Sequence, residues 1–380
     1  MDFKISCEDF SKLDRKNLEI IDIRDAQSFD YGHVFGALNL NNADVFDYAS
    51  DLKNRKFVVY CDNGDKSEKL VKDLQKQKIN AFALLGGYAE WINFNSKLTN
   101  KKQKTLIAEE SIRGKFHRQL LSKFAKALNE YELLKPNDKV AVCISGGKDS
   151  MCMAKLFQEI KRHNKIPFEV EFLVMDPGYS KKNRQIIERN AKLLGVPITI
   201  FETDIFKNVY HINSSPCYMC ARMRRGSLYA KAKELGCNKI ALGHHYDDVI
   251  ETILMGMLYG AQVQTMMPKL HSNNFEGMEL IRPMYLIREQ DIKHWRDFNN
   301  LYFIQCACKM TERFKENGEE NFGSKRKKVK KIIADLSREE QQIEGNIFRS
   351  VEGVNLATVI SYKDKDGKIH SFLEDYDKLK

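Results

Sequence analysis

A glycine-rich turn at residues 145–150 separates two stretches of different pattern. The run before it, KVAVCI (139–144), is apolar and rich in β-branched residues, and MCMAKLFQEI (151–160) has the pattern of a helix. A strand that enters a helix through such a turn is the building unit of parallel α/β sheets. Glycines let the backbone approach a ligand, serines offer hydroxyls, and the helix N-terminus attracts negative charge. The sequence therefore predicts an α/β fold with an anion-binding loop made of Ser145, Gly146, Gly147, Lys148, Asp149 and Ser150.

The α/β pattern continues on both sides of this turn. After it, apolar runs are expected at 168–176, 196–204 and 238–245, and a helix is expected at 181–194. Before it, strands are expected at 18–25, 56–63 and 79–87, with a helix at 66–77. The polar, lysine-rich stretch 95–105 lacks an apolar period, and we interpret it as a linker. We therefore expect two domains, 1–100 and 106–355, followed by an extension of unknown role at 356–380.

The charge of the chain is concentrated in the second of these parts. The chain has 62 Lys and Arg and 52 Asp and Glu, of which residues 1–100 hold 14 and 16. The basic remainder indicates contact with a polyanion, and we expect phosphate contacts at SKRKKVKK (324–331). No apolar run is long enough to span a bilayer, and the N-terminus lacks a secretion pattern. We therefore expect a cytoplasmic protein that does not bind membranes.

Nine cysteines without a secretion signal indicate thiol or metal chemistry rather than a disulfide scaffold. Cys217 and Cys220 open a basic helical stretch, and their spacing can serve a metal site, a dithiol redox pair or half of a zinc site. With Cys306, and Cys308 close behind, a three-cysteine site can form. Apolar surroundings predict buried, unreactive thiols at Cys143 and Cys152.

The loop SGGKDS (145–150) resembles the pyrophosphate loop of the PP-loop family, whose members cleave ATP to AMP and pyrophosphate while adenylating a substrate. Four more stretches follow in the order found in the TtcA family, the tRNA 2-thiocytidine synthases of that superfamily. They are CYMCARMRRG (217–226), 241–270, IRPMYLIREQDI (281–292) and FIQCAC (303–308). The resemblance covers roughly residues 106–355. It implies a Rossmann-type parallel sheet, like that of the adenine nucleotide alpha hydrolases, with helical additions.

The same resemblance implies a cofactor, a nucleotide and a substrate. A [4Fe–4S] cluster would be held by Cys217, Cys220 and Cys306, with Cys308 as the alternative third ligand because only one residue separates the last two. Three thiolates leave one iron open to bind sulfur. A cytidine in the anticodon loop of tRNA would be the substrate. ATP with Mg²⁺ would be bound by Ser145, Gly146, Gly147, Lys148, Asp149, Ser150, Asp176, Gly243, His244 and Asp247.

The run GHHYDD (243–248) follows a predicted strand. Its histidines and carboxylates can form a metal site of their own, but at the carboxyl edge of a parallel sheet they are better placed to contact ATP or Mg²⁺. A structural role for the two histidines stays open. We expect Asp149 and Asp248 to hold Mg²⁺ during catalysis and Arg224 to hold nucleotide or tRNA phosphate.

The first hundred residues resemble a rhodanese domain throughout, in EIIDIRDAQSFDYGHVFGALNL (19–40), VVYCDNGDKS (58–67) and LLGGYAEW (84–91). Cys61 opens a loop between a strand and a helix. Backbone N–H groups of that loop and the helix N-terminus would favour a thiolate and stabilise a persulfide. Lys66 stands where rhodaneses usually have arginine, which weakens binding of an oxyanion donor. The alternative is an inactive module used for docking.

Together these features predict an ATP-dependent tRNA sulfurtransferase. ATP would adenylate the base oxygen, Cys61 would carry sulfur as a persulfide to the open iron, and sulfur would displace AMP. The expected partners are tRNA and a cysteine desulfurase or another sulfur donor. The sequence does not decide whether the chain forms a homodimer. The rival interpretations are a 2-thiouridine-forming enzyme, a PP-loop enzyme that activates a small molecule, and a persulfide-sensing binding protein.

Overall fold

The computed structural model describes residues 3–14, 17–52, 54–97, 101–163, 165–205, 216–303, 324–374 and 376. Positions 31, 95–97, 101–103, 182, 216–221 and 324 are described by their backbone alone. The chain forms two compact units. The first comprises Met1–His245 and Pro268–Glu316, and the second comprises Tyr246–Met267 and Asn317–Lys380.

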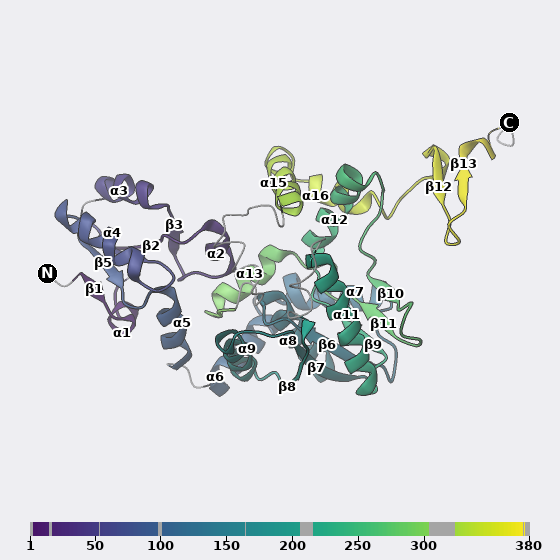
Figure 1. Cartoon of the computed structure of the whole chain (residues 1–380), viewed down its shortest axis with the longest axis horizontal. Coiled ribbons are helices and arrows are strands. Elements are labelled where there is room, and N and C mark those ends of the chain that lie inside the picture. The colour runs from purple at the N-terminus through teal and green to yellow at the C-terminus, as the bar shows by residue number, and fades with distance from the viewer. Residues whose placement is uncertain are drawn as a thin grey trace. The chain divides into compact units, whose positions relative to one another are not determined.

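The N-terminal part of the first unit is a five-stranded sheet in the order β1-β5-β4-β2-β3, with all neighbouring strands parallel (Figure 1). Its strands are β1 (Lys4–Ile5), β2 (Leu18–Asp22), β3 (Ala37–Asn39), β4 (Lys56–Tyr60) and β5 (Ala81–Leu84). The accompanying helices are α1 (Cys7–Ser11), α2 (Ala26–Tyr31), α3 (Asn42–Asp51), α4 (Asp65–Lys76) and α5 (Gly87–Lys97). The central strand β4 is buried from Phe57 to Tyr60, since both faces of the sheet carry apolar clusters.

The second part of this unit is a six-stranded sheet in the order β10-β11-β9-β6-β7-β8. The strands are β6 (Lys139–Ile144), β7 (Glu169–Asp176), β8 (Ile198–Glu202), β9 (Lys239–Ala241), β10 (Lys269–His271) and β11 (Glu279–Ile281). Only the edge pair β10–β11 is antiparallel. The chain moves from β6 to β7 and β8 on one side and then returns to β9 on the other side of β6. Such a switch point opens a crevice at the carboxyl ends of the two strands, where α/β proteins bind ligands.

Helices of this part are α6 (Lys101–Arg113), a π-helical turn (His117–Leu121), α7 (Ser122–Glu130), α8 (Lys148–His163), α9 (Lys181–Leu194), α11 (Pro216–Glu234) and α13 (Glu289–Phe298). The predicted helix at 181–194 is confirmed to the residue because Ser180 caps its start and Gly195, in a left-handed conformation, ends it. The expected α/β class is confirmed, with the refinement that β10 makes the second sheet mixed.

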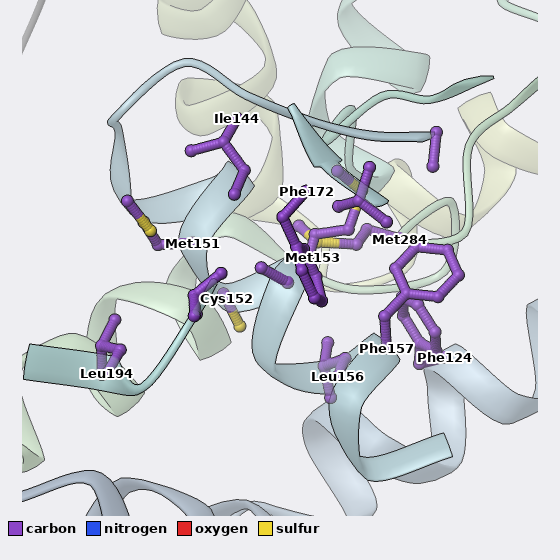
Figure 2. Packing of buried hydrophobic residues seen from close by; sticks show 14 of the residues in the cluster. Phe124, Ile144, Met151, Cys152, Met153, Leu156, Phe157, Phe172, Leu194 and Met284 are labelled. Carbon is purple, nitrogen blue, oxygen red and sulfur yellow. The ribbon is translucent and has the colours of Figure 1, made fainter. Parts of the chain in front are cut away.

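Helix α8 is deeply buried over most of its length. Its side chains Met151, Cys152, Met153, Leu156 and Phe157 have no measurable exposure. Figure 2 shows them packed within one apolar cluster that also contains strand residues of the sheet. Even the charged Lys155 is buried, and its ammonium group donates to Glu109 Oε1 (2.7 Å) and to the Leu194 carbonyl (2.9 Å). Burial lowers the pKa of Lys155, and the hydrogen bond and charge of Glu109 partly offset this effect. The helix is therefore held on all sides, and its N-terminus has a fixed position.

The prediction of a linker at 95–105 is wrong over most of its length. Helix α5 extends to Lys97 and α6 begins at Lys101. Thr105 Oγ1 donates to the Leu193 carbonyl (2.8 Å), and Ala108 and Ile112 are fully buried further along α6. Lysine is a good helix former, so a lysine-rich helix start resembles a linker when the sequence is read locally.

In the described residues of the second unit, three α-helices are followed by a β-hairpin with a short 3-10 turn on either side. Helix α12 (Tyr246–Gly260) packs with α15 (Ser324–Glu339) and α16 (Ile343–Arg349), and strands β12 (Ser361–Lys363) and β13 (Ile369–Ser371) pair antiparallel. Tyr246 stacks on Phe348 with ring centroids 4.6 Å apart, and Val329 and Ile333 of α15 are buried. None of the described helices in either unit has the length and apolar character required to cross a membrane.

The first prediction concerns the buried lysine of α8. Lys155→Ala should lower the free energy of unfolding by about 3 kcal/mol, because Glu109 and the Leu194 carbonyl lose their buried partner. The control is Lys161→Ala on the same helix, where the side chain is exposed and the change should stay within about 0.5 kcal/mol. Urea unfolding followed by circular dichroism measures both. Equal midpoints for the two variants would show that α8 is not held by this network.

Candidate active site

The predicted anion-binding loop joins β6 to α8 at the switch point of the second sheet. Gly146 adopts a left-handed backbone with φ 86°, which only glycine enters without strain. Ser150 Oγ accepts from the Ser145 N–H (3.2 Å) and donates to the Gly147 carbonyl (3.0 Å). The hydroxyls of Ser145 and Ser150 are 3.2 Å apart. The serine side chains therefore hold the loop in its conformation. The loop backbone lies at the N-terminus of a 16-residue helix, and this position favours the binding of an anion.

Gly243, on the segment after β9, closes one side of this loop. A Cβ atom built on Gly243 would lie 3.3 Å from the Ser150 nitrogen and 3.4 Å from its Cα. Close approach of two backbones at this point accounts for glycine at this position. His245, two residues on, is buried, and its Nε2 lies 4.0 Å from Asp149 Oδ1. The structure thus brings the loop and the start of the GHHYDD run together.

The two charged side chains of the loop have unequal surroundings. Lys148 is buried, and its ammonium lies 3.1 Å from Asp149 Oδ1 and 3.0 Å from Glu289 Oε1. Burial alone would lower the pKa of Lys148, but the charges of Asp149 and Glu289 outweigh burial and raise it. Asp149 Oδ1 is itself buried, and it lies between the Lys148 ammonium and His245 Nε2. That oxygen is a suitable ligand for a hard cation such as Mg²⁺.

Glu289 is a site residue that the sequence analysis did not single out. It opens α13 and lies within the stretch IRPMYLIREQDI (281–292), which carried the family resemblance. No local pattern announces its contact with Lys148, because the two residues come from separate helices.

Asp176 lies at the carboxyl end of β7, next to β6 in the sheet. Its Oδ1 accepts from the N–H groups of Gly178 (2.9 Å) and Tyr179 (2.7 Å), and Oδ2 lies 3.2 Å from Arg184. The carboxylate therefore shapes the turn after β7. Its predicted part in nucleotide binding stays a prediction.

Asp247 and Asp248 are in the first turn of α12, which belongs to the second unit. Within that unit Asp248 Oδ1 lies 3.3 Å from Arg326 of α15, whose guanidinium also lies 3.3 Å from Glu251 Oε2. Asp248 therefore has a cationic partner on the basic helix, which the sequence analysis did not foresee.

The cysteines expected to hold a cluster fall largely outside the description. Cys217 and Cys220 lie in the first turn of α11 with only their backbone described, and Cys306 and Cys308 lie outside the described residues. Among the side chains that are described, no group of three metal-ligating residues occurs. Arg224 of α11 is close enough to Cys143, near the end of β6, for its charge to oppose the rise in the pKa of that thiol.

Four other cysteines are buried free thiols, as expected for Cys143 and Cys152. Burial raises the pKa of Cys143 to about 12, an effect that the Arg224 charge partly offsets. Burial also raises the pKa of Cys152 well above its ordinary value. The pKa of Cys7 and that of Cys237 are each raised to about 11 by burial. High pKa values keep these thiols protonated and unreactive near neutral pH.

Cys61 has a different setting, at the start of the loop between β4 and α4. The Gly64 N–H donates to Cys61 Sγ (3.2 Å), and Ser67 Oγ lies 3.6 Å from the same sulfur. Gly64 has φ 100° and forms the N-terminal boundary of α4, a 12-residue helix. The backbone of Gly87 packs directly against the loop. A Cβ atom built on Gly87 would lie only 2.6 Å from the Gly64 nitrogen. The sulfur therefore faces a backbone N–H and a helix N-terminus, an arrangement that can stabilise a bound persulfide.

Comparison with known proteins agrees with this geometry. Residues 116–318 match the model of the PP-loop domain, and residues 8–94 match that of the rhodanese-like domain. The chain is 31% identical over 258 residues to the tRNA-cytidine(32) 2-sulfurtransferase of Syntrophotalea carbinolica, a match that takes in 67% of this chain and 96% of that relative. The chain belongs to this family of PP-loop sulfurtransferases. It is therefore an enzyme with a PP-loop domain that uses ATP, as the sequence predicted.

Other members of the family show the same relation. The tRNA-cytidine(32) 2-sulfurtransferase of Anaeromyxobacter sp. (strain K) is 31% identical over 265 residues, covering 69% of this chain and 86% of that one. Among solved structures, the U34-tRNA thiolase NcsA from Methanococcus maripaludis, determined with its [4Fe–4S] cluster, has a TM-score of 0.50 at 23% identity. That match covers 62% of this chain and 78% of NcsA. At this identity the likeness shows a shared fold.

The second prediction tests the close approach of Gly243 to the loop. Gly243→Ala should raise the KM for ATP by about tenfold, because its methyl group displaces the Ser150 backbone by a few tenths of an ångström. The Tm should change by less than about 3 °C. ATP-dependent AMP formation and a thermal scan measure these quantities. Gly353→Ala, where a Cβ meets nothing within 4 Å, is the control. An unchanged KM would remove Gly243 from the nucleotide site.

Proposed function

We propose that this sulfurtransferase converts a cytidine of tRNA to 2-thiocytidine and uses ATP to activate the base. The observation that carries the proposal is the loop Ser145–Ser150, which is held by its own serines, closed by Gly243, and contains the Asp149 carboxylate beside the buried Lys148 ammonium. The names of the relatives in this family, tRNA-cytidine(32) 2-sulfurtransferases, support cytidine 32 as the target.

In the activation step, the C2 oxygen of the base attacks the α-phosphorus of ATP and pyrophosphate leaves. The loop N–H groups and the N-terminus of α8 stabilise the departing pyrophosphate. Asp149 would bind Mg²⁺ through its Oδ1, and the ion would neutralise phosphate charge. The sequence assigns Asp248 to Mg²⁺ binding as well, and this role stays a proposal. Arg224 would contact nucleotide or tRNA phosphate. Asp176 and His244 would complete the nucleotide site at this sheet edge, and Asp247 is assigned to nucleotide binding from the sequence.

In the transfer step, sulfur attacks the activated C2 carbon, and AMP leaves with the former base oxygen. Cys61 would supply that sulfur as a persulfide, which the Gly64 N–H and the start of α4 would stabilise. A cellular thiol would attack Cys61 Sγ, so that the outer sulfur leaves at the oxidation level of sulfide and the thiol and Cys61 remain joined by a disulfide. Cys217, Cys220 and Cys306, with Cys308 as the alternative, would hold a [4Fe–4S] cluster, whose fourth iron could bind sulfur. A cysteine desulfurase would reload Cys61. Since its substrate is tRNA, we assign the enzyme to the cytoplasm.

Helix α15 supports tRNA as the substrate. Its first turn contains no acidic residue, whereas Asp335 and Glu339 lie toward its C-terminal end. This distribution of charged side chains along α15 is the reverse of the one that the helix dipole favours, which is anions at the N-terminus and cations at the C-terminus. A polyanion bound along the first half would relieve the repulsion between the basic side chains and add counterion release. The exposed basic side chains of that half are Lys325, Arg326, Lys327, Lys328, Lys330 and Lys331.

The third prediction separates activation from sulfur supply. Asp149→Asn should reduce tRNA-dependent AMP formation by about 100-fold or more, because the site loses its cation ligand. Cys61→Ser should leave AMP formation intact but slow thiolation when a desulfurase is the sulfur source. Quantified AMP and mass spectrometry of digested tRNA provide both readouts.

The matched controls are Asp73→Asn, an exposed carboxylate of α4, and Cys7→Ser, a buried thiol of α1. Both should behave like the wild type. AMP formation that survives in Asp149→Asn would refute the loop assignment, and a 2-thiouridine product would refute cytidine as the substrate.

A further inference from the structure

Tyr302 links the two sheets of the first unit. Its side chain is 8% exposed and packs in the apolar cluster of the rhodanese-like sheet, although it follows α13 in the PP-loop part. The Trp91 indole N–H donates to the Tyr302 hydroxyl at 2.7 Å, across 211 positions of sequence. The Tyr88 ring meets Tyr302 edge to face with centroids 5.8 Å apart. On the PP-loop side, Asn190 of α9 donates to the Tyr302 carbonyl at 2.8 Å.

Polar contacts extend this junction on both sides. Arg189 of α9 donates to the Ile92 carbonyl (2.9 Å) and to Asn93 Oδ1 (3.1 Å). Lys293 of α13 pairs with Asp30 at 2.9 Å. Arg296, 1% exposed, donates to the Asp30 carbonyl at 2.8 Å. Separation of the two parts would expose aromatic surface and exchange these hydrogen bonds for bonds to water, at a cost that comes chiefly from the lost apolar burial.

The junction also reaches both reaction loops. The Tyr88 N–H donates to the Cys61 carbonyl at 2.8 Å, and the Tyr88 ring contacts Tyr302. At the other end, Glu289 of α13 lies 3.0 Å from Lys148 of the PP-loop and 3.8 Å from Lys293. The segment 289–303 therefore contacts the support of the Cys61 loop and the lysine of the ATP loop.

We propose that Tyr302, Trp91, Arg189, Asp30, Lys293 and Arg296 form an interdomain joint that holds the sulfur-carrying domain in one fixed position on the PP-loop domain. This inference rests on the proposed sulfur relay from Cys61. A carrier on a flexible tether depends on linker length, because its effective concentration falls as the linker grows. A carrier that is docked in one position does not depend on the length of its linker. Tyr302 and Trp91 act as positioning residues, since neither touches ATP or the sulfur.

The fourth prediction uses that difference. A flexible Gly/Ser insert of about ten residues between Lys97 and Lys101 should leave donor-limited thiolation unchanged in the otherwise native chain. The same insert in the Arg189→Ala/Tyr302→Phe variant should slow it by about fivefold or more, because the domain now depends on its tether. AMP formation should stay constant in all these proteins. Lys192→Ala, an exposed residue of α9, is the matched control.

Thermal unfolding followed by calorimetry provides a readout that does not depend on sulfur chemistry. The wild type should unfold in one transition that includes both sheets, and Arg189→Ala/Tyr302→Phe should split it or lower it for the rhodanese-like part alone. Two separate transitions in the wild type, or an insert that slows the wild type as much as the variant, would overturn the joint. If Cys61→Ser leaves donor-limited thiolation unchanged, the sulfur relay is refuted, and calorimetry still decides the joint.

Discussion

The burial of α8 fixes the position of the anion-binding loop, on which the proposed chemistry depends. Side chains from Met151 to Phe157 fill the space between the sheet and its neighbouring helices, and Lys155 is tied to Glu109 and to the Leu194 carbonyl. Close packing leaves such a helix no room to shift. The N–H groups at its N-terminus therefore keep their direction when charge develops on a phosphate. Preorganised dipoles of this kind need no reorganisation during the reaction.

The rhodanese-like domain uses the same device for sulfur. A buried strand ends just before Cys61, a left-handed glycine turns the chain, and a helix N-terminus faces the sulfur atom. In both loops a second glycine approaches from a neighbouring segment, Gly243 in one and Gly87 in the other. One physical principle thus serves a phosphate in the first loop and a persulfide in the second. The joint around Tyr302 connects the two.

Local patterns predicted much of the fold and the two loops. The central strands, α9 and the helices after both loops have strong apolar periods or caps, so a window of ten to twenty residues identifies them. The contacts of Lys148 with Glu289 and of Trp91 with Tyr302 could not be predicted this way, because each joins residues far apart in sequence. In the sequence, the start of α6 resembles a linker because its lysines give the helix no apolar period.

The central claim is that this enzyme thiolates cytidine in tRNA. The most direct measurement is mass spectrometry of nucleosides from the tRNA of cells that lack the gene, compared with cells that regain it. The account predicts that 2-thiocytidine disappears with the gene and returns with the wild-type copy but not with the Asp149→Asn copy. An unchanged level of 2-thiocytidine, or loss of 2-thiouridine in its place, would contradict the account.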